Sequence, residues 1–343
     1  MYPVPEHLPI PSVAELNKEM ENFVIQASSG RNKRFKDPYK VLQFVHFTDV
    51  HYKLELWNRL IEYVNTYSEY IDFALHTGDY CGCSQTEYFC DLYKEGIECK
   101  RPIFNCTGNH DCIESYANES STPKDVHPIC FPSQVTEKWD VNFIPGEYPL
   151  SYYKDFPESN LRMIVLDAYF VTEEQCNWLE GLLNDALEKG IHVITVAHEM
   201  TNPITNRFDV PFQTLDNFFY GLKDGRRPMG LQWPLFDPII AEFKNKGGMH
   251  VCHLAGNEHC EYFGFTDGGV LNSVAPCATY NTVSCDCLRV RGTKSYDCFN
   301  VIAVDTNLHL LKIIRIGNDL DHYLRQKKVI CWDYKNQKMI SSL

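Results

Sequence analysis

Short apolar runs recur along the chain, and several of them are followed directly by polar residues of the kind that bind metals. The runs are rich in branched or aromatic side chains and too short for typical helices, so they indicate buried strands. They cover Val41–Phe47, Ile71–His76, Pro102–Thr107, Val193–Ala197 and Met249–Ala255. We therefore expect each run to form a strand that ends in a polar loop.

Amphipathic helices are expected between some of these strands. Apolar residues repeat at helical spacing after the first run, and the resulting β-α-β unit predicts a parallel sheet. A second helix begins with the capping box Thr172–Gln175, stops at Gly190 and leads to the run at Val193. The residues of the first helix that repeat in this way are Leu56, Trp57, Leu60, Ile61 and Val64.

Beyond Val270 the pattern changes to strands and turns without helices. These strands would complete a second sheet, with a hairpin turn at Val304–Leu308. The expected strands are Val270–Val274, Thr279–Val283, Phe299–Asp305 and Leu308–Ile316.

The chain divides into a main domain and two flanking segments. Residues 1–39 form an N-terminal extension with a helix, residues 40–320 the main domain, and residues 321–343 a C-terminal tail. Long irregular loops at 113–149 and 201–234 follow the polar strand ends and are expected to wall a substrate pocket. Residues in these loops that could contact substrate include Trp139, Arg207, Arg226 and Arg227.

The polar residues after the strands have the chemistry of a binuclear metal site. In open α/β sheets, ligands gather at the carboxyl ends of the strands, so residues far apart in sequence can converge there. Histidine, carboxylate and amide donors suit zinc, manganese or iron, and no thiolate belongs to the set. The candidates are Asp49, His51, Asp79, Asn109, His110, Asp111, His198, Asn257 and His259.

These residues stand in motifs whose order and spacing resemble the calcineurin-like metallophosphoesterase family, in particular its bacterial-type phosphohydrolases. The motifs are Asp49-Val50-His51, Gly78-Asp79, Gly108-Asn109-His110-Asp111, His198 and Gly256-Asn257-Glu258-His259. The resemblance implies an α/β (α+β) fold, a four-layer αββα sandwich of two mixed β-sheets flanked by helices. One position departs from the family pattern, because the family closes with Gly-His-x-His and Asn257 replaces the first of those histidines.

By this resemblance, Asp79 bridges two divalent or trivalent transition-metal ions (Mn, Fe or Zn). Asp49, His51 and His259 complete the first metal site, and Asn109 and His198 hold the second, with Asn257 at the position of the missing histidine. A metal-bridging hydroxide would attack the phosphorus. His110 would assist the leaving oxygen. Asp111 either orients His110 or stabilises the turn, and the sequence leaves both roles open.

Composition and net charge indicate which classes of partner the protein binds. The chain has 343 residues, 44% of them hydrophobic, and a formal net charge of -13. That charge disfavours long nucleic acid and favours a small phosphorylated substrate. We expect no membrane segment, and the absence of a leader pattern predicts a cytoplasmic protein. The 15 cysteines are expected to be reduced thiols.

The expected function is two-metal hydrolysis of a small phosphomonoester, phosphodiester or nucleotide-type substrate. The alternatives are a degenerate member of the same fold that binds or scaffolds without turnover, and a nuclease of that fold. Three further histidines, His46, His76 and His253, lie inside apolar runs and are expected to be hydrogen-bonded core residues.

Overall fold

The structure is a computed structural model of the chain. It describes residues 38–80, 92, 95–112, 122–201, 235–257, 262–266, 268–275, 298–317 and 329–340. The expected N-terminal helix, the expected strand at 279–283 and nearly all of the loop at 201–234 lie outside these ranges. Within them, no helix has both the length and the apolar character needed to cross a bilayer.

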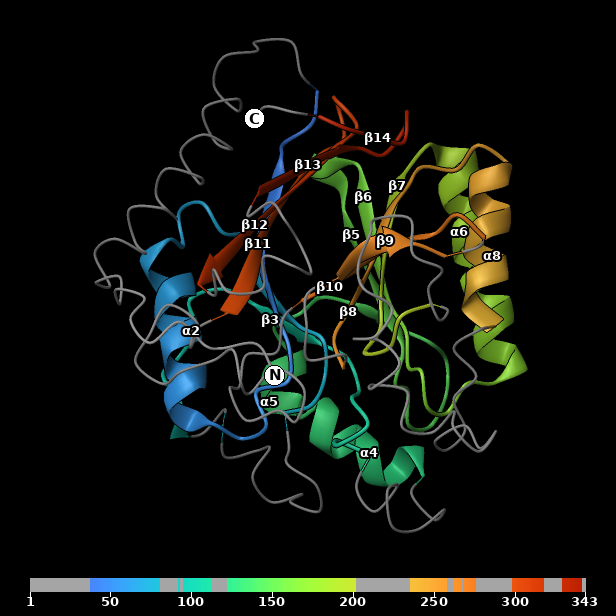
Figure 1. Ribbon diagram of the computed structural model, residues 1–343. Coiled ribbons are helices and arrows are strands. Elements are labelled where there is room, and N and C mark those ends of the chain that lie inside the picture. Colours follow the sequence, from blue (N-terminus) through green and yellow to red (C-terminus); the bar gives the residue numbers. More distant parts are fainter. Residues whose placement is uncertain are drawn as a thin grey trace, which may run out of the picture.

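The described strands form two mixed sheets that face each other (Figure 1). The first has the order β14-β13-β12-β11-β1-β2-β3, in which β1, β2 and β3 run parallel and β11 is antiparallel to β1. Its strands are β1 (Leu42–Phe47), β2 (Phe73–His76), β3 (Ile103–Asn105), β11 (Cys298–Asp305), β12 (Leu310–Gly317), β13 (Val329–Asp333) and β14 (Lys338–Met339).

The second sheet has the order β4-β5-β6-β7-β8-β10-β9, and its central strands β6, β7, β8 and β10 are parallel. Parallel strands end at one edge, so the loops after them gather on one side of the molecule. The strands are β4 (Asn142–Phe143), β5 (Tyr152–Phe156), β6 (Leu161–Val165), β7 (His192–Val196), β8 (His250–Ala255), β9 (Tyr262–Phe265) and β10 (Leu271–Val274).

Helices cover the outer faces of both sheets. Helix α2 (Leu54–Thr66) lies against the first sheet, while α6 (Glu173–Lys189) and α8 (Phe236–Asn245) lie together against the second (Figure 1). Helix α6 begins and ends where the sequence predicts, because the hydroxyl of Thr172 accepts the Gln175 N–H and Gly190 adopts φ 66°. The four-layer αββα sandwich is therefore confirmed. The shorter helices are α4 (Pro123–Cys130), α5 (Ser133–Thr136) and the 3₁₀ turn η1 (Pro157–Ser159).

Alternation along the strands separates an inner core from the outer ones. On β1, Phe44 points into the core between the sheets, whereas Val45 packs toward α2. Phe44 is fully buried and stacks on Phe73 with ring centroids 4.5 Å apart. Trp139, one of the candidates for substrate contact, is 2% exposed and packs in this inner core.

Two segments differ from the sequence prediction. The stretch at 113–149, expected to be irregular, contains α4, α5 and β4, and Pro128 inside α4 hides the helical pattern. The segment 321–343, expected to be a tail, contributes β13 and β14 to the first sheet, where the apolar residues Ile330 and Trp332 are buried. The predicted hairpin between β11 and β12 is present, and the Asp305 carboxylate accepts the N–H groups of Asn307 and Leu308 at 3.1 Å.

Removing the Phe44 ring should destabilise the fold through a cavity between the sheets. We expect Phe44→Ala to lower the free energy of unfolding by roughly 3–5 kcal/mol, measured by urea denaturation. Ile97→Ala is the control, because Ile97 is 43% exposed and should change stability by no more than about 0.5 kcal/mol. Equal losses in the two variants would contradict the assignment of Phe44 to the core.

Candidate metal centre

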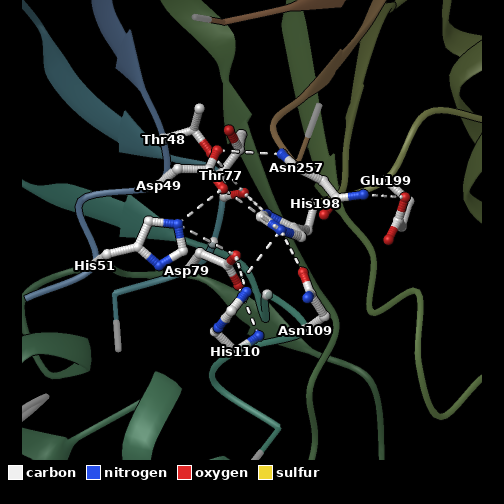
Figure 2. A network of polar contacts seen from close by, with 12 residues as sticks. Thr48, Asp49, His51, Thr77, Asp79, Asn109, His110, His198, Glu199 and Asn257 are labelled. Atoms are coloured by element: carbon white, nitrogen blue, oxygen red, sulfur yellow. Dashed lines mark hydrogen bonds and ion pairs between the residues drawn. The ribbon is translucent and has the colours of Figure 1, made fainter. Parts of the chain in front are cut away.

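The loops after β1, β2 and β8 turn sharply and bring their polar residues together. Asp49, Asp79 and Asn257 have positive φ values of 54°, 60° and 61°, and His51 has 44°. This left-handed conformation is costly for most residues, and Asp, Asn and His adopt it more readily than others. The residue types at these strand ends therefore suit both the turn and the binding of a cation (Figure 2).

Two glycines allow the loops to come into backbone contact. A Cβ on Gly108 would lie 2.2 Å from the amide nitrogen of Asp79, and one on Gly78 would lie 2.5 Å from Nδ1 of His198. Both distances are far below van der Waals contact, so a side chain at either position would push the loops apart. The Gly-Asp and Gly-Asn-His-Asp motifs thus have a steric reason for their glycines.

The carboxylate of Asp111 joins the same two loops. Its Oδ2 accepts the N–H groups of Asp79 at 2.8 Å and of Gly108 at 2.9 Å, and its Oδ1 accepts the N–H of Tyr80 at 2.9 Å. These contacts support the turn-stabilising role that the sequence left open. Orientation of His110 by Asp111 stays a prediction.

His198, fully buried after β7, presents one ring nitrogen to the site. Its Nδ1 donates to the carbonyl oxygen of Thr77, which leaves Nε2 to face the acidic residues. Nε2 lies 3.0 Å from Oδ1 of Asn109, 3.4 Å from Oδ1 of Asp79 and 4.0 Å from Oδ1 of Asp49. A backbone carbonyl on the far nitrogen is the usual way in which proteins orient a metal-binding histidine.

The charges of the buried groups are strongly coupled. Burial disfavours the protonated form of His198, but Asp79 and Asp49 outweigh it and raise the pKa of His198 well above its ordinary value. Burial likewise raises the pKa of Asp79, but His198, His110 and His51 outweigh it and lower that pKa well below its ordinary value. The site therefore stabilises negative carboxylates and attracts positive charge.

The described donor atoms converge in two groups that could each hold a metal ion. One consists of Asp49, Asp79 and His198, and the other of His51, Asp79 and His110. Asp79 belongs to both, as expected of a bridging ligand, and its Oδ2 is buried without a hydrogen-bond partner in the described part of the chain. A buried, unsatisfied carboxylate oxygen among imidazoles fits a divalent cation.

His110 is the most exposed of the three described histidines of the site, although His51 is close to it at 15%. The backbone N–H of His110 donates to Oδ1 of Asp79 at 2.8 Å, and its Nε2 lies 3.8 Å from Oδ2 of Asp79. The side chain is 20% exposed and packs edge-on against the ring of His51, with centroids 4.8 Å apart. It can act as a third metal ligand in its donor group. Because it is partly exposed, it can also contact an oxygen atom of a bound substrate.

A further carboxylate, that of Glu199, lies beside Asn257 and was not predicted from the sequence. Its Oε2 accepts the Asn257 amide N–H at 2.9 Å (Figure 2). Its Oε1 accepts the Tyr169 hydroxyl at 2.8 Å. Burial, opposed in part by His198, raises the pKa of Glu199. The only available sequence signal was its position directly after His198.

The remaining predicted residues divide into core residues and residues outside the described ranges. His46 contacts the hydroxyl of Thr77 at 3.1 Å, His76 accepts the Gly78 N–H, and His253 lies between the Thr195 hydroxyl and the Glu199 carbonyl. Burial lowers the pKa of His46 to about 3 and that of His253 to about 4. His259 and the arginines at 207, 226 and 227 lie outside the described residues.

Comparison with known proteins agrees with this geometry. The profile of the calcineurin-like phosphoesterase family matches residues 42–263, so the chain belongs to this family of metal-dependent phosphoesterases. No curated protein matches the sequence significantly.

Two solved structures are similar to this chain at low sequence identity. A dimetal phosphatase from Danio rerio is 11% identical with a TM-score of 0.53, and the alignment covers 82% of this chain and 100% of that one. At this identity the likeness to the phosphatase shows the fold alone. GAP50, described as the anchor in the inner membrane complex of Plasmodium, is 12% identical with a TM-score of 0.47 over 88% of this chain and 90% of its own.

Metal content should depend on Asp79 more than on any other ligand. We expect protein purified without chelator to carry about two transition-metal ions per chain. Asp79→Asn should lose both ions because Asp79 belongs to both donor groups, whereas Asn109→Ala should lose only the ion near His198. Elemental analysis measures these contents.

The control is Asp140→Asn, which alters an exposed carboxylate paired with Lys154 and should leave the metal content unchanged. A parent protein without bound metal, even after reconstitution with manganese, would contradict the metal assignment.

Proposed function

We propose that this chain is a two-metal phosphoester hydrolase that acts on a small phosphomonoester, phosphodiester or nucleotide-type substrate. The observation that carries the proposal is the position of Asp79, which is shared by two groups of donor atoms and lies beside the more exposed His110. We propose manganese, iron or zinc as the metals, because imidazole and carboxylate donors suit these ions.

The residues of the site would have different roles in metal binding and catalysis. By resemblance to the family, Asp49, His51 and Asp79 would hold one ion, with His259 completing its ligands. Asp79, Asn109 and His198 would hold the other, with Asn257 at the position of the missing family histidine. The described donor groups differ from this division, because Asp49 lies in one group with His198. When bound, two dications activate a water molecule and stabilise the negative charge of the phosphoryl group. His110 would donate a proton to the leaving oxygen, since imidazole exchanges protons near neutral pH. Asp111 would keep the Asp79 loop in place.

The net charge of -13 supports a small substrate over a long polyanion. A polymer would meet repulsion over much of its contact surface, whereas a small phosphate ester contacts little beyond the metal ions. Arg207, Arg226 and Arg227 stay candidates for substrate binding.

The variant His110→Ala should distinguish an active hydrolase from a scaffold protein that does not turn substrate over. If His110 protonates the leaving oxygen, kcat on esters with poor leaving groups should fall by roughly 10²–10⁴-fold. The leaving group of a nitrophenyl ester needs little protonation, so kcat on that ester should fall much less. Steady-state kinetics on both ester types, with metal content measured in parallel, test this.

His309→Ala is the matched control, because His309 lies beside His192 at the amino end of β7, away from the strand ends that carry the site. Its kinetics should match those of the parent protein. Equal losses on both ester types in His110→Ala would exclude the acid role. A metal-loaded parent protein that hydrolyses no ester in a panel of monoesters, diesters and pyrophosphates would favour the scaffold.

A further inference from the structure

Three residues from consecutive strand ends form a hydrogen-bonded chain beside the site. Tyr169 follows β6, Glu199 follows β7 and Asn257 follows β8. The Tyr169 hydroxyl donates to Oε1 of Glu199 at 2.8 Å, and the Asn257 amide donates to Oε2 at 2.9 Å. Glu199 is 8% exposed, so this carboxylate is held away from bulk water.

The hydrogen bonds among these three side chains fix the orientation of the Asn257 amide. Nδ2 of Asn257 lies 2.9 Å from Oε2 of Glu199, so the amide turns its nitrogen toward Glu199. The amide oxygen then lies on the opposite side of the planar group, away from Glu199. The backbone N–H of Asn257 donates to Oδ2 of Asp49 at 3.2 Å, which places this residue beside the carboxylates of the site.

The backbone of Glu199 is hydrogen-bonded in addition to its side chain. Its carbonyl oxygen accepts from Nε2 of His253 at 2.9 Å, and His253 in turn contacts the Thr195 hydroxyl at 2.9 Å. Glu199 also follows directly after His198 in the sequence. One short segment therefore carries a metal-ligand candidate and the support for another.

We propose that Glu199, anchored by Tyr169, is a positioning residue that holds the carbonyl oxygen of Asn257 toward the second metal ion. This inference rests on the proposed function, because it assumes that Asn257 ligates that ion. An amide oxygen is a neutral and weak donor for transition metals, and a freely rotating amide would present either end. The carboxylate removes this ambiguity, as the hydrogen-bond partners of metal ligands commonly do.

Direct ligation by Glu199 is the competing role. Both of its oxygens already accept hydrogen bonds, from Tyr169 and from Asn257. The described group of donor atoms at this position contains Asp49, Asp79 and His198 without Glu199. The contacts therefore favour support over ligation, and the two roles differ in how they depend on Asn257.

A double-mutant cycle tests the proposal. Manganese is titrated calorimetrically into the stripped full-length protein and into Glu199→Ala, Asn257→Ala and the double variant. We expect Glu199→Ala to weaken the second site by about 10–100-fold, the usual effect of removing a ligand's supporting group. In the Asn257→Ala background the same change should have less than about a twofold effect, because the amide it acts through is absent.

Two further variants complete the experiment, one as a milder change in the same hydrogen-bonded group and one as a control. Tyr169→Phe removes one hydroxyl from the chain and should weaken the second site less than Glu199→Ala does, again only when Asn257 is present; it serves if Glu199→Ala does not fold. Glu188→Ala removes an exposed carboxylate on α6 and should leave both sites unchanged. Urea unfolding of the stripped proteins checks that each variant is folded.

The possible failures are distinguishable. A parent protein that binds fewer than two manganese ions overturns both the proposed function and this inference. Two bound ions with unchanged second-site affinity in Glu199→Ala and in Tyr169→Phe overturn this inference alone. An equal loss with and without the Asn257 side chain also overturns it, because Glu199 would then act as a ligand or through its charge.

Discussion

The buried carboxylate of Asp79 is the constraint on which the site depends. An ionised group without solvent exposure is costly unless cations or hydrogen bonds compensate it. Asp79 has no exposed surface and lies next to Asp49, another fully buried acid. Three histidines face Asp79 within 4 Å, and they outweigh the effect of burial so that the pKa of Asp79 lies well below its ordinary value. A pair of dications would balance both acids more completely.

The fold serves this constraint through the order of its strands. The loops after β1, β2 and β3 come from one sheet and those after β7 and β8 from the other, so donors from both sheets meet at one edge of the sandwich. Asp111 joins the Asp79 loop to the Gly108 loop, and Asn257 reaches Asp49 through its backbone. Packing of the sheets through Phe44 and its neighbours fixes the distance between the two halves of the site.

The strand ends could be predicted because short apolar runs bounded by polar residues are a feature of the local sequence. Strand β6 could not, because Arg162 lies within it; its side chain is 3% exposed and pairs with Asp155 and Asp185. Strand β13 was not predicted either, and it pairs with β12 across residues 318–328.

Glu199 belongs to no motif, and its meaning appears only when the ends of β6, β7 and β8 lie side by side. His253, expected as a hydrogen-bonded core residue, donates from Nε2 to the backbone carbonyl oxygen of Glu199.

Anomalous diffraction from crystals grown with manganese would show whether Asp79 lies between two metal ions. We expect two anomalous peaks about 3.5–4 Å apart, one on each side of the Asp79 carboxylate, with Asn109 and His198 next to one of them. Absence of any peak at saturating manganese, or a single peak away from Asp79, would contradict this expectation.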